Sequence, residues 1–562
     1  MANRLKPLLT CSCALLAVVC AAALVYLSIA TFVGAGRCRS SSSFKHAAVA
    51  ADSKLCSEIG KKMLQRGGSA VDGAIAALLC TSVVNPQSMG IGGGSILLIR
   101  NKTGDVKVYN FRESVPKSIK PNVLKDCPTT FTLSTGSQWI GVPGELRGYE
   151  AIHKQYGKLP WSELFQPTIK LAREGIPIPP YLAYLMSVPL VKHYVENSSL
   201  CEVLCKNDGT ILTEGDTLRF SKLAETLETV AQLGADAFYS GKIGHNLIQD
   251  VKAAGGTLTL EDLKSFQVQV DKPWTVSLGN IQMHFPPPPA GGALLAIILQ
   301  IMRGFSLSSD SLHGDKKIQM YHRYIEAAKF ANGQKGSIYD PLFNNSFPSA
   351  EHLIDPSFAD KIRKLISSDR THDRSYYKVA PSSDRFGTTH VSVLDEDGLA
   401  VSATSTINEL FGGGVYSSQT GVILNNELVD FCWRTNTLRA GERPPSSMTP
   451  VILESKSGRI LVIGGSGGSM ITSAVALSLI NHLWLGMSLT DAIAAPIAFI
   501  DSNNNVNFEK GFDESVIKGL KALGHKVGKW EFFVNVVNAL EKENGCIEAV
   551  SDSRKRGIPA GY

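Results

Sequence analysis

An apolar run near the N-terminus constrains this chain more than any other feature. Residues 7–36 read PLLTCSCALLAVVCAAALVYLSIATFVGAG and contain no charged side chain. About 20 apolar residues are enough to span a bilayer, whereas the apolar part of a cleaved secretory signal is usually about 7–15 residues long. We therefore expect a retained transmembrane signal-anchor. Cleavage near residues 33–35 is the alternative.

Acceptor triplets for N-linked glycans indicate on which side of the membrane the rest of the chain lies. The flanking charges do not decide this, because basic residues lie on both sides of the run. The triplets at Asn101, Asn197 and Asn344 match the N-x-Ser/Thr pattern, which is modified only in lumenal or extracellular segments. We expect a single-pass type II protein of the cell membrane, with residues 1–6 as the cytoplasmic tail and the bulk outside.

The cysteines agree with an oxidising compartment. The chain has 11 of them, and disulfides within the C-x3-C pair Cys201 and Cys205, and between Cys56 and Cys80, would fit that compartment. A tetrahedral zinc site is disfavoured, since no histidine or second cysteine pair completes a ligand set. We expect no metal. The sequence leaves open the state of four further cysteines: Cys38, Cys127, Cys432 and Cys546.

Helix-like and strand-like patterns are interleaved over the remaining length. Residues 57–84 predict two helices separated by a Gly-Gly pair, 161–172 a helix with a break or kink at Pro167, and 220–256 a largely helical stretch. Strands are expected at residues 95–100, 106–111, 389–395, 400–404, 421–424 and 459–463. The strict βαβ rhythm of a doubly wound sheet is missing. The near-balanced charge of +6, without runs of like charge, gives no reason to propose a nucleic-acid partner.

One glycine-rich motif could bind an anion. Residues 459–480, RILVIGGSGGSMITSAVALSLI, read as a strand, a glycine loop and an apolar helix. Backbone N–H groups converge at such a loop and can hold an anion or a developing oxyanion. The motif is neither a Walker loop nor a dinucleotide fingerprint. A simple strand-to-helix turn is the alternative interpretation.

A second motif, DRFGTTHVSV at residues 384–393, raises the question of a cut in the chain. A threonine can act as a nucleophile when its own α-amine, with a pKa near about 8, accepts the hydroxyl proton. Thr388 gains such an amine only if the bond after Gly387 is broken, and glycine tolerates the strained backbone of an N-to-O acyl shift. A turn leading into a strand is the alternative. A serine-hydrolase triad is disfavoured because no G-x-S-x-G elbow is present.

Outside the apolar run, the chain resembles the γ-glutamyltransferase (glutathione hydrolase) family of N-terminal-nucleophile hydrolases. The likeness is carried, in order, by GGSAVDGAIAALLC, VVNPQSMGIGGG, GVPGELRGY, GADAFYSGKIG, PPPPAGG, VSATSTIN, GVILNNELVDF, PPSSMTP, GGSGG and the terminal SDSRKRGIPAGY. Within the family it is most similar to the vertebrate branch that acts on leukotriene C4. The resemblance implies an α+β fold, a four-layer αββα sandwich, behind the N-terminal transmembrane helix. It also implies a heavy subunit of residues 37–387 and a light subunit of residues 388–562, joined as a heterodimer after self-cleavage.

The resemblance assigns roles to individual residues. The cleavage site is Gly387–Thr388, with Thr388 as nucleophile and the Thr406 hydroxyl bonded to it, while Gly467 and Gly468 form the oxyanion hole. The α-ammonium of the γ-glutamyl group would be bound by Asn408, Glu427 and Asp430. Its α-carboxylate would be bound by Arg112, Ser446 and Ser447. His390 is expected to be structural. Disulfides Cys56–Cys80 and Cys201–Cys205 are implied as well.

The implied reaction cleaves the γ-glutamyl amide of glutathione or its S-conjugates through an acyl-threonine, without metal or organic cofactor. The glutamyl group passes to water or to an amino acid or dipeptide acceptor. Two departures bear on acceptor choice: Glu409 adds a negative charge beside Asn408, and Cys432 is either reactive or paired. The alternatives are an uncleaved inactive homologue, an adhesion or receptor ectodomain, and an N-terminal-nucleophile acylase for other amides.

Overall fold

The computed structural model describes residues 38, 43–128, 133, 135–343, 349–380, 382, 384–432, 434, 437–530 and 533–562. The expected tail at residues 1–6, the expected anchor at 7–36 and Asn344 lie outside this part of the chain. None of the helices in the described ranges is long and apolar enough to cross a membrane. Asn197 is exposed and Asn101 half-buried.

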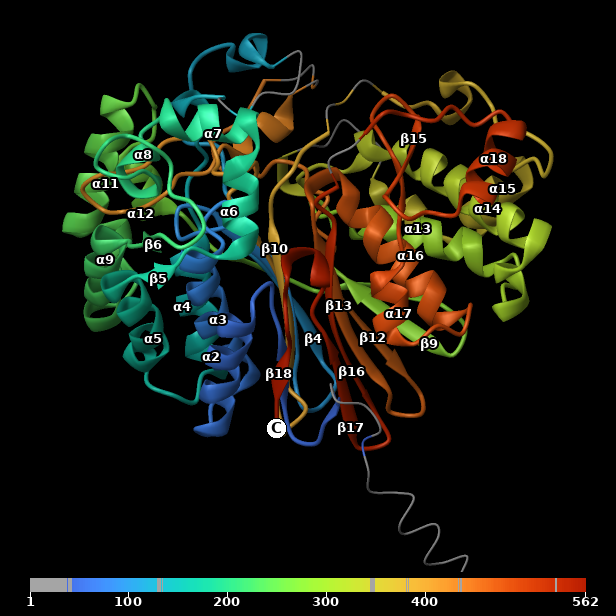
Figure 1. The fold of residues 1–562 in the computed structure, drawn as a ribbon, viewed down its shortest axis with the longest axis horizontal. Helices are drawn as coiled ribbons and strands as arrows, with labels where there is room; N and C mark the ends of the chain where they lie inside the picture. Colours follow the sequence, from blue (N-terminus) through green and yellow to red (C-terminus); the bar gives the residue numbers. More distant parts are fainter. Residues whose placement is uncertain are drawn as a thin grey trace, which may run out of the picture.

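Two seven-stranded antiparallel sheets form the centre of the molecule (Figure 1). The first has the order β1 (Ser43–Phe44), β17 (Cys546–Val550), β16 (Val536–Glu543), β13 (Ile460–Ser466), β12 (Val451–Ser455), β9 (Ile281–Phe285) and β8 (Trp274–Ser277). The second has the order β18 (Ala560–Gly561), β2 (Ala48–Ala50), β10 (Thr389–Leu394), β11 (Ala400–Thr406), β3 (Gly94–Arg100), β4 (Val106–Asn110) and β7 (Gln269–Asp271). Two small sheets pair β5 (Ile176–Pro177) with β6 (Thr217–Leu218) and β14 (Ala498–Ile500) with β15 (Val506–Phe508).

The two large sheets pack face to face. Strand β10 contacts β13 and β16 of the other sheet. Hydroxyl groups cross the interface, since Ser392 donates to the carbonyl of Val462 at 3.4 Å and Ser402 to that of Ile463 at 3.1 Å. Both central strands, β10 and β11, are buried along their whole length. Their serine and threonine side chains are therefore enclosed between layers and need such partners.

Helices cover both outer faces and complete four layers (Figure 1). One group comprises α2 (Lys54–Gln65), α3 (Ala70–Val84), α4 (Glu145–Tyr156), α5 (Trp161–Glu174), α6 (Pro180–Ser187), α7 (Pro189–Glu196), α8 (Cys201–Leu204), α9 (Ser221–Leu233), α10 (Asp236–Tyr239), α11 (Lys242–Ala253) and α12 (Leu260–Ser265). The other comprises α13 (Gly292–Arg303), α14 (Gly314–Asn332), α15 (Pro356–Leu365), α16 (Ile471–Leu483), α17 (Leu489–Ala494) and α18 (Glu514–Ala522). Helix α3 contacts β10 and β11, and α16 contacts β13 and β16. The predicted αββα sandwich is confirmed.

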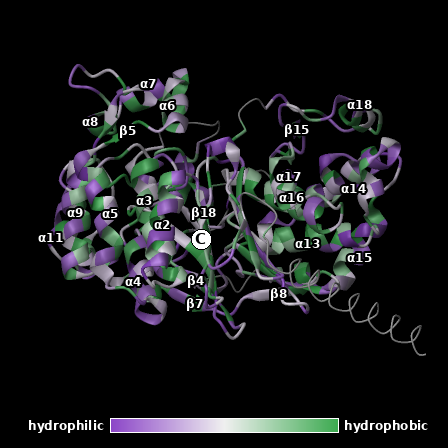
Figure 2. Cartoon of the chain, turned by 60° about the horizontal axis from the view of Figure 1, so that its bottom comes forward, coloured by the Kyte–Doolittle hydropathy of each residue, from purple (hydrophilic) through white to green (hydrophobic). Residues whose placement is uncertain are grey.

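Hydropathy explains which helices lie next to the sheets. All residues of α3 are buried, and α13 and α16 are buried along most of their length. Figure 2 shows hydrophobic colour on these three helices and hydrophilic colour on the outer helix α14. A helix that is apolar all round is stable only where other layers surround it, which is how α3 lies between the sheet and α2 and α5.

Most predicted elements are confirmed, and their ends follow local rules. Ser69 and Asp72 form a capping box at the start of α3, and Thr259 and Asp262 form one at α12. The helix predicted at residues 161–172 is confirmed, and of the break or kink predicted at Pro167 the break is wrong, because α5 continues to Glu174. Proline removes one helical N–H bond, and burial of the apolar face of α5 against α3 and α9 outweighs that loss.

The strand predicted at residues 421–424 is also wrong. These residues form only isolated bridges, Ile423 to Tyr416 and Leu424 to Gly92. Gly421 has a φ of +75°, which an extended strand does not allow. The segment instead crosses closely over Gly92, where any Cβ would lie 2.2 Å from the Ile423 carbonyl oxygen. The strand-like run of apolar residues reflects burial in this crossing.

Four disulfides connect the described residues. Two are the pairs that the resemblance implies, Cys56–Cys80 and Cys201–Cys205. The other two join cysteines whose state the sequence left open, Cys38–Cys546 and Cys127–Cys432. Cys432 is therefore paired in this structure and is not a free thiol.

Candidate active site

The backbone is strained at the expected cleavage site. Thr388, immediately before β10, has a φ of +81°, and Gly387 has a φ of +144°. A positive φ is a genuine outlier for a β-branched residue, because its Cβ crowds the neighbouring carbonyl group. Only glycine fits at position 387, where an added Cβ would lie 1.8 Å from the carbonyl oxygen of Asn408. Strain of this kind occurs at functional sites.

The glycine loop after β13 contacts this strained bond directly. The backbone N–H of Gly467 donates to the carbonyl oxygen of Gly387 at 2.9 Å. Gly467 and Gly468 have φ angles of +115° and +58°, and a Cβ on Gly468 would lie 2.0 Å from the carbonyl oxygen of Arg385. The loop therefore needs glycine for its shape and its close approach. It places a donor where an oxyanion on Gly387 would develop.

The Thr388 hydroxyl is oriented by a second threonine. Thr388 Oγ1 donates to Thr406 Oγ1 at 3.1 Å, and Thr406 Oγ1 also accepts the backbone N–H of Asn408 at 2.8 Å. Thr406 is the last residue of β11, which pairs with β10. Sheet register thus sets the distance between the two hydroxyl groups.

A buried lysine, which sequence reasoning missed, lies on the other side of Thr388. Lys555 Nζ donates to the carbonyl oxygen of Thr388 at 2.8 Å and forms an ion pair with Asp52 at 2.8 Å. The Thr388 N–H donates to the carbonyl oxygen of Ser88 at 3.2 Å. A signal was present, since Lys555 belongs to the terminal SDSRKRGIPAGY motif and Ser88 to VVNPQSMGIGGG. These contacts fix the backbone on both sides of Thr388.

The expected substrate-binding charges lie together and are almost fully buried. Arg112 Nη1 lies 2.5 Å from Glu427 Oε1, and Nη2 lies 2.7 Å from Asp430 Oδ2. The side chains of Arg112 and Glu427 are 1% exposed, and that of Asp430 is 15% exposed. Asn408 Nδ2 donates to Asp430 Oδ1 at 3.3 Å. Buried charges in this geometry are strongly coupled, because the surroundings screen them poorly.

Burial changes the proton affinity of this cluster. It raises the pKa of Glu427 to about 7, against the lowering effect of Arg112. Burial lowers the pKa of Arg112, but the charges of Glu427 and Asp430 outweigh this and raise it. Burial and next the charge of Glu427 raise the pKa of neighbouring Glu113 well above its ordinary value. Both oxygens of Glu113 and the Oε2 atom of Glu427 are buried without a hydrogen-bond partner.

These residues line one cavity of about 360 Å³. Its walls include Arg112, Arg385, Thr388, Thr406, Asn408, Glu427, Asp430, Ser446, Ser447 and Gly468. Every expected site residue of the binding and nucleophile sets is thus brought together. A second hollow of about 440 Å³, beside residues 369–374 and 522–526, contains none of them. Volume alone does not identify the site; the convergent polar groups do.

The added charge expected from Glu409 is corrected by the structure. Glu409 is fully buried, and it forms an ion pair with Arg385 at 2.8 Å and accepts from Asn426 Nδ2 at 2.7 Å. Burial raises the pKa of its carboxyl group, against the lowering effect of Arg385. Its charge is therefore compensated, and Glu409 is not among the residues that line the cavity. His390 is structural in its contacts, bonded to Thr404 and Ser392, and burial lowers its pKa to about 3.

Comparison with known proteins agrees with this geometry. Residues 56–562 match the family described as gamma-glutamyltranspeptidase. The chain is 46% identical to the glutathione hydrolase 5 proenzyme of Rattus norvegicus, over 92% of this chain and 93% of that protein. The chain belongs to the γ-glutamyltranspeptidase family. It is an enzyme of the hydrolase and transferase kind, similar to the glutathione hydrolase 5 branch.

Solved structures support the fold. A cephalosporin acylase from Bacillus halodurans superposes with a TM-score of 0.81, at 24% identity, over 94% of this chain and 98% of its own. The γ-glutamyltranspeptidase of Helicobacter pylori is 30% identical, with a TM-score of 0.53, over 57% of this chain and 92% of that chain. Members of the γ-glutamyltranspeptidase family and this acylase share an N-terminal-nucleophile-hydrolase-like sandwich, so fold alone does not choose the substrate.

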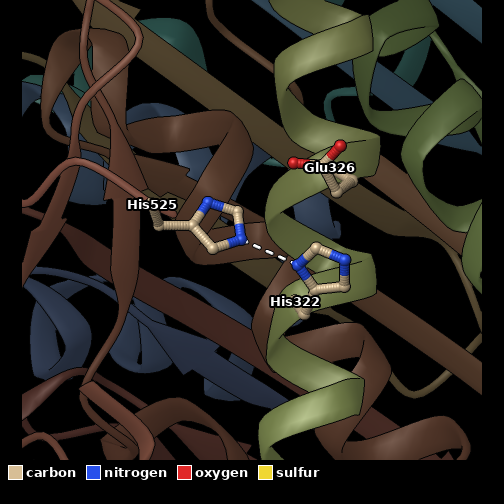
Figure 3. Close-up of side chains that lie close together, drawn as sticks. All are labelled: His322, Glu326 and His525. Carbon is tan, nitrogen blue, oxygen red and sulfur yellow. Dashed lines mark hydrogen bonds between the residues drawn. The ribbon is translucent and has the colours of Figure 1, made fainter. Parts of the chain in front are cut away.

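The enzyme also contains a buried cluster of metal-ligand residue types, His322, Glu326 and His525 (Figure 3). His322 and Glu326 lie on α14, and His525 follows α18. No local sequence pattern predicts this cluster, since the two histidines are 203 positions apart. His322 Nε2 donates to the Ser367 carbonyl at 2.7 Å, so its Nδ1 accepts from His525 Nε2 at 2.8 Å.

The remaining atoms of this cluster also have partners. His525 Nδ1 accepts from Lys329 Nζ at 3.1 Å, and Glu326 accepts from Thr371 at 2.7 Å and Tyr377 at 2.6 Å. Burial lowers the pKa of His322, and burial with the nearby charge of Lys329 lowers that of His525 to about 2. The hydrogen bonds of this cluster are complete, and the Lys329 amine occupies the position beside His525 that a cation would need.

Proposed function

We propose that this enzyme is a self-processing proenzyme that cleaves the γ-glutamyl amide of glutathione and of glutathione S-conjugates such as leukotriene C4. It first cuts its own Gly387–Thr388 bond, giving a heavy subunit of residues 37–387 and a light subunit of residues 388–562. Thr388 then carries the glutamyl group as an acyl-enzyme and passes it to water, an amino acid or a dipeptide. One observation carries the proposal: a strained threonine whose preceding carbonyl oxygen accepts from Gly467.

Self-cleavage follows from this arrangement as an N-to-O acyl shift. Thr388 Oγ1 attacks the carbonyl carbon of Gly387, and the Gly467 N–H stabilises the oxyanion on the Gly387 oxygen. As the intermediate collapses, the hydroxyl proton passes to the Thr388 nitrogen and the C–N bond breaks, which frees the α-amine, leaves an ester on Thr388 and relieves its positive φ. Water then hydrolyses the ester to give the Gly387 carboxylate and the Thr388 hydroxyl group. The Ser88 carbonyl, which accepts the Thr388 N–H in this structure, is in place to hold that amine.

Turnover uses the same groups a second time. The freed α-amine accepts the proton of Thr388 Oγ1 as it attacks the γ-carbonyl carbon of the substrate, and Gly467 with Gly468 stabilises the oxyanion. Thr406 orients the hydroxyl group through its 3.1 Å bond. The amine then protonates the leaving Cys-Gly or its conjugate. Water or an acceptor amine attacks the ester and releases the glutamyl group.

The charged cluster explains why a γ-glutamyl group is the preferred acyl donor. Its α-carboxylate requires a cation, which Arg112 supplies beside Ser446 and Ser447, and its α-ammonium requires acceptors, which Glu427 and Asp430 supply. The substrate zwitterion would insert into ion pairs that already exist, so the buried charges remain compensated before and after binding. An acylase for other amides has no need for both charges.

The proposed location is the cell surface, with the catalytic part outside and residues 7–36 as a single-pass type II anchor. Four disulfides within the described residues support an oxidising compartment. Exposed Asn197 is compatible with a glycan.

The test is mass spectrometry of the full-length enzyme quenched during turnover of glutathione. We expect a light chain that carries one γ-glutamyl group on Thr388, and release of glutamate and Cys-Gly. Leukotriene C4, offered in parallel, should lose the same group. A light chain that forms but never gains the group from either compound would contradict the substrate assignment. Loss of activity on glutathione but not on a simple acyl amide in Arg112→Gln would support γ-glutamyl recognition over a general acylase.

A further inference from the structure

Two of the four disulfides span the proposed cut. Cys38–Cys546 and Cys127–Cys432 each join a cysteine before Gly387 to one after it. Cys56–Cys80 and Cys201–Cys205 lie entirely before it. If the chain is cut after Gly387, the first two bonds become links between subunits, and the last two stay within the heavy subunit.

The Cys127–Cys432 bond is attached to the substrate site. Cys432 directly follows the short helix η8 (Glu427–Phe431), which carries both Glu427 and Asp430, and Cys432 itself lines the cavity. We call residues 427–432 the acidic strap. Its only regular structure is this one 3₁₀ turn, so the position of its two carboxylates depends on what the strap packs against.

The contacts behind the strap come from the other side of the cut. Leu428, Val429 and Phe431 pack in a small hydrophobic cluster, separate from the main core, with Val115, Val123 and Trp139. Cys127 packs against the same cluster. A small apolar cluster supplies limited stabilisation, and a covalent link across it reduces the freedom of the strap. Cys546, in contrast, begins β17 and pairs with β16 of a seven-stranded sheet.

We propose that the mature enzyme is a covalently joined heterodimer, in which the Cys127–Cys432 disulfide holds the acidic strap in its binding geometry and makes γ-glutamyl affinity sensitive to thiols. This inference rests on the proposed self-cleavage. Cys38–Cys546 has the same linking role without influence on affinity. The Cys38–Cys546 bond therefore only links the subunits, whereas the Cys127–Cys432 bond also maintains the affinity for the γ-glutamyl group.

The chemistry is thiol–disulfide exchange with a low-molecular-weight thiol. A thiolate attacks the sulfur of Cys127, the less buried of the two residues, and expels Cys432 as a thiolate. A second thiolate attacks the mixed disulfide, so that two thiols are oxidised to one disulfide as the protein disulfide is reduced to two thiols. The proposed substrate glutathione and its product Cys-Gly both carry such a thiol. The acidic strap thus lies at the site where the thiol-bearing substrate binds and the thiol-bearing product leaves.

The covalent link is tested on denaturing gels of the full-length enzyme. Without reductant, wild type should run as one species, and with reductant as two. Variants that lack one linking pair, C127S/C432S or C38S/C546S, should still run as one species without reductant, and the variant lacking all four cysteines as two. Wild-type subunits that separate without reductant would overturn the covalent link. A chain that stays whole under reduction would instead contradict self-cleavage, so the two failures are distinguishable.

The proposed effect on affinity is tested with the competitive inhibition constant of glutamate, which reports binding at the γ-glutamyl site. If the untethered strap is competent about a tenth of the time, C127S/C432S should raise this constant and KM about tenfold with kcat within about twofold. The matched control C38S/C546S should leave all three within about twofold. Equal effects in both variants would overturn the assignment.

A measurement on wild type keeps the proposal testable if C127S/C432S does not fold. The enzyme is titrated with reduced glutathione, and newly exposed thiols are alkylated and located by mass spectrometry while glutamate inhibition is followed. We expect Cys127 and Cys432 to be labelled before Cys38 and Cys546, in step with the loss of affinity. Loss of affinity without labelling of Cys432, or labelling without loss, would contradict the proposal.

Discussion

Two buried polar clusters in this enzyme differ in whether their hydrogen bonds are complete. In the network of His322, His525 and Lys329 each donor faces an acceptor, and the chain of bonds ends on protein carbonyl and carboxylate groups. In the cluster of Arg112, Glu427 and Asp430, the charged side chains line a cavity, and Glu427 Oε2 has no hydrogen-bond partner. Both are buried, and both shift pKa values.

This difference distinguishes a ligand-binding site from a structural hydrogen-bond network. A buried polar group without a partner costs free energy, and a bound ligand is one way to supply that partner. A perturbed pKa alone marks both clusters and distinguishes neither. Unused bonding capacity directed into a cavity, next to a strained backbone, distinguishes the first. Changes in the first cluster should alter catalysis, and changes in the second should alter stability.

The largest effect is expected at Thr388. Replacement by alanine removes the nucleophile of both self-cleavage and turnover, so the chain should stay whole and activity should fall by at least about 10³-fold. Thr388→Ser keeps a hydroxyl group and should still be processed, at a lower rate. Gel analysis and glutathione hydrolysis measure both. Normal processing in Thr388→Ala would show that another residue performs the cut.

The next largest effect is expected at Arg112. In Arg112→Lys the single ammonium group keeps the charge but cannot bond Glu427, Asp430 and the substrate carboxylate together. Breaking a buried, hydrogen-bonded charge pair costs about 2–5 kcal/mol, so kcat/KM should fall about 30-fold or more. Self-cleavage should continue, because Arg112 does not contact Gly387 or Thr388 through any bond described above. Arg459→Lys, at an arginine that pairs with Glu541 on β16, is the matched control. A similar kinetic loss in both variants would assign the effect to folding.

A pH dependence of intermediate size follows from Glu427. Its pKa is raised to about 7, and the α-ammonium binds only the ionised carboxylate, so the affinity for glutamate should decrease as pH falls below about 7. The limiting slope is about tenfold per pH unit. Arg112, Asp430 and Glu113 face the same group, and Glu427→Gln should remove the slope while weakening binding at high pH. The same slope in Glu427→Gln would place the titrating group elsewhere.

The smallest effect on activity is expected in the histidine network. His525→Gln interrupts bonds to His322 and Lys329 and should lower the free energy of unfolding by about 1–3 kcal/mol, seen as a lower melting temperature. Glutathione kinetics should change less than about twofold. A chelator should change neither quantity in wild type. A melting temperature that drops on chelation would show that the network holds a metal.

Sequence patterns predicted strands and helices correctly in segments where one pattern of apolar residues dominates. Strands β10 and β11 and helices α3 and α16 lie close to their expected positions. The two strands are rich in β-branched residues, and the two helices are apolar runs too long for a typical strand. The failures came from tertiary context. Residues 421–424 are apolar because they are buried where they cross Gly92, and Pro167 lies within a helix because two neighbours cover that helix.

The site residues likewise divide into those that a local motif predicts and those that depend on tertiary contacts. Thr388, Gly467 and the charged residues could be predicted because a motif resemblance marks them, and the cavity brings them together. Lys555 lies in a quoted motif, but its contact with Thr388 joins segments 167 positions apart, and no local pattern predicts that contact or the Arg385–Glu409 pair. The Cys127–Cys432 link is of this kind, since its partners are 305 positions apart.

N-terminal sequencing of the smaller species on a reducing gel of the deglycosylated enzyme tests the central claim most directly. The account predicts a light chain that begins Thr-Thr-His-Val, with Thr388 first and its α-amine free. A single uncut chain would contradict it, because Thr388 would then lack its base and the strained Gly387–Thr388 bond would have no catalytic meaning.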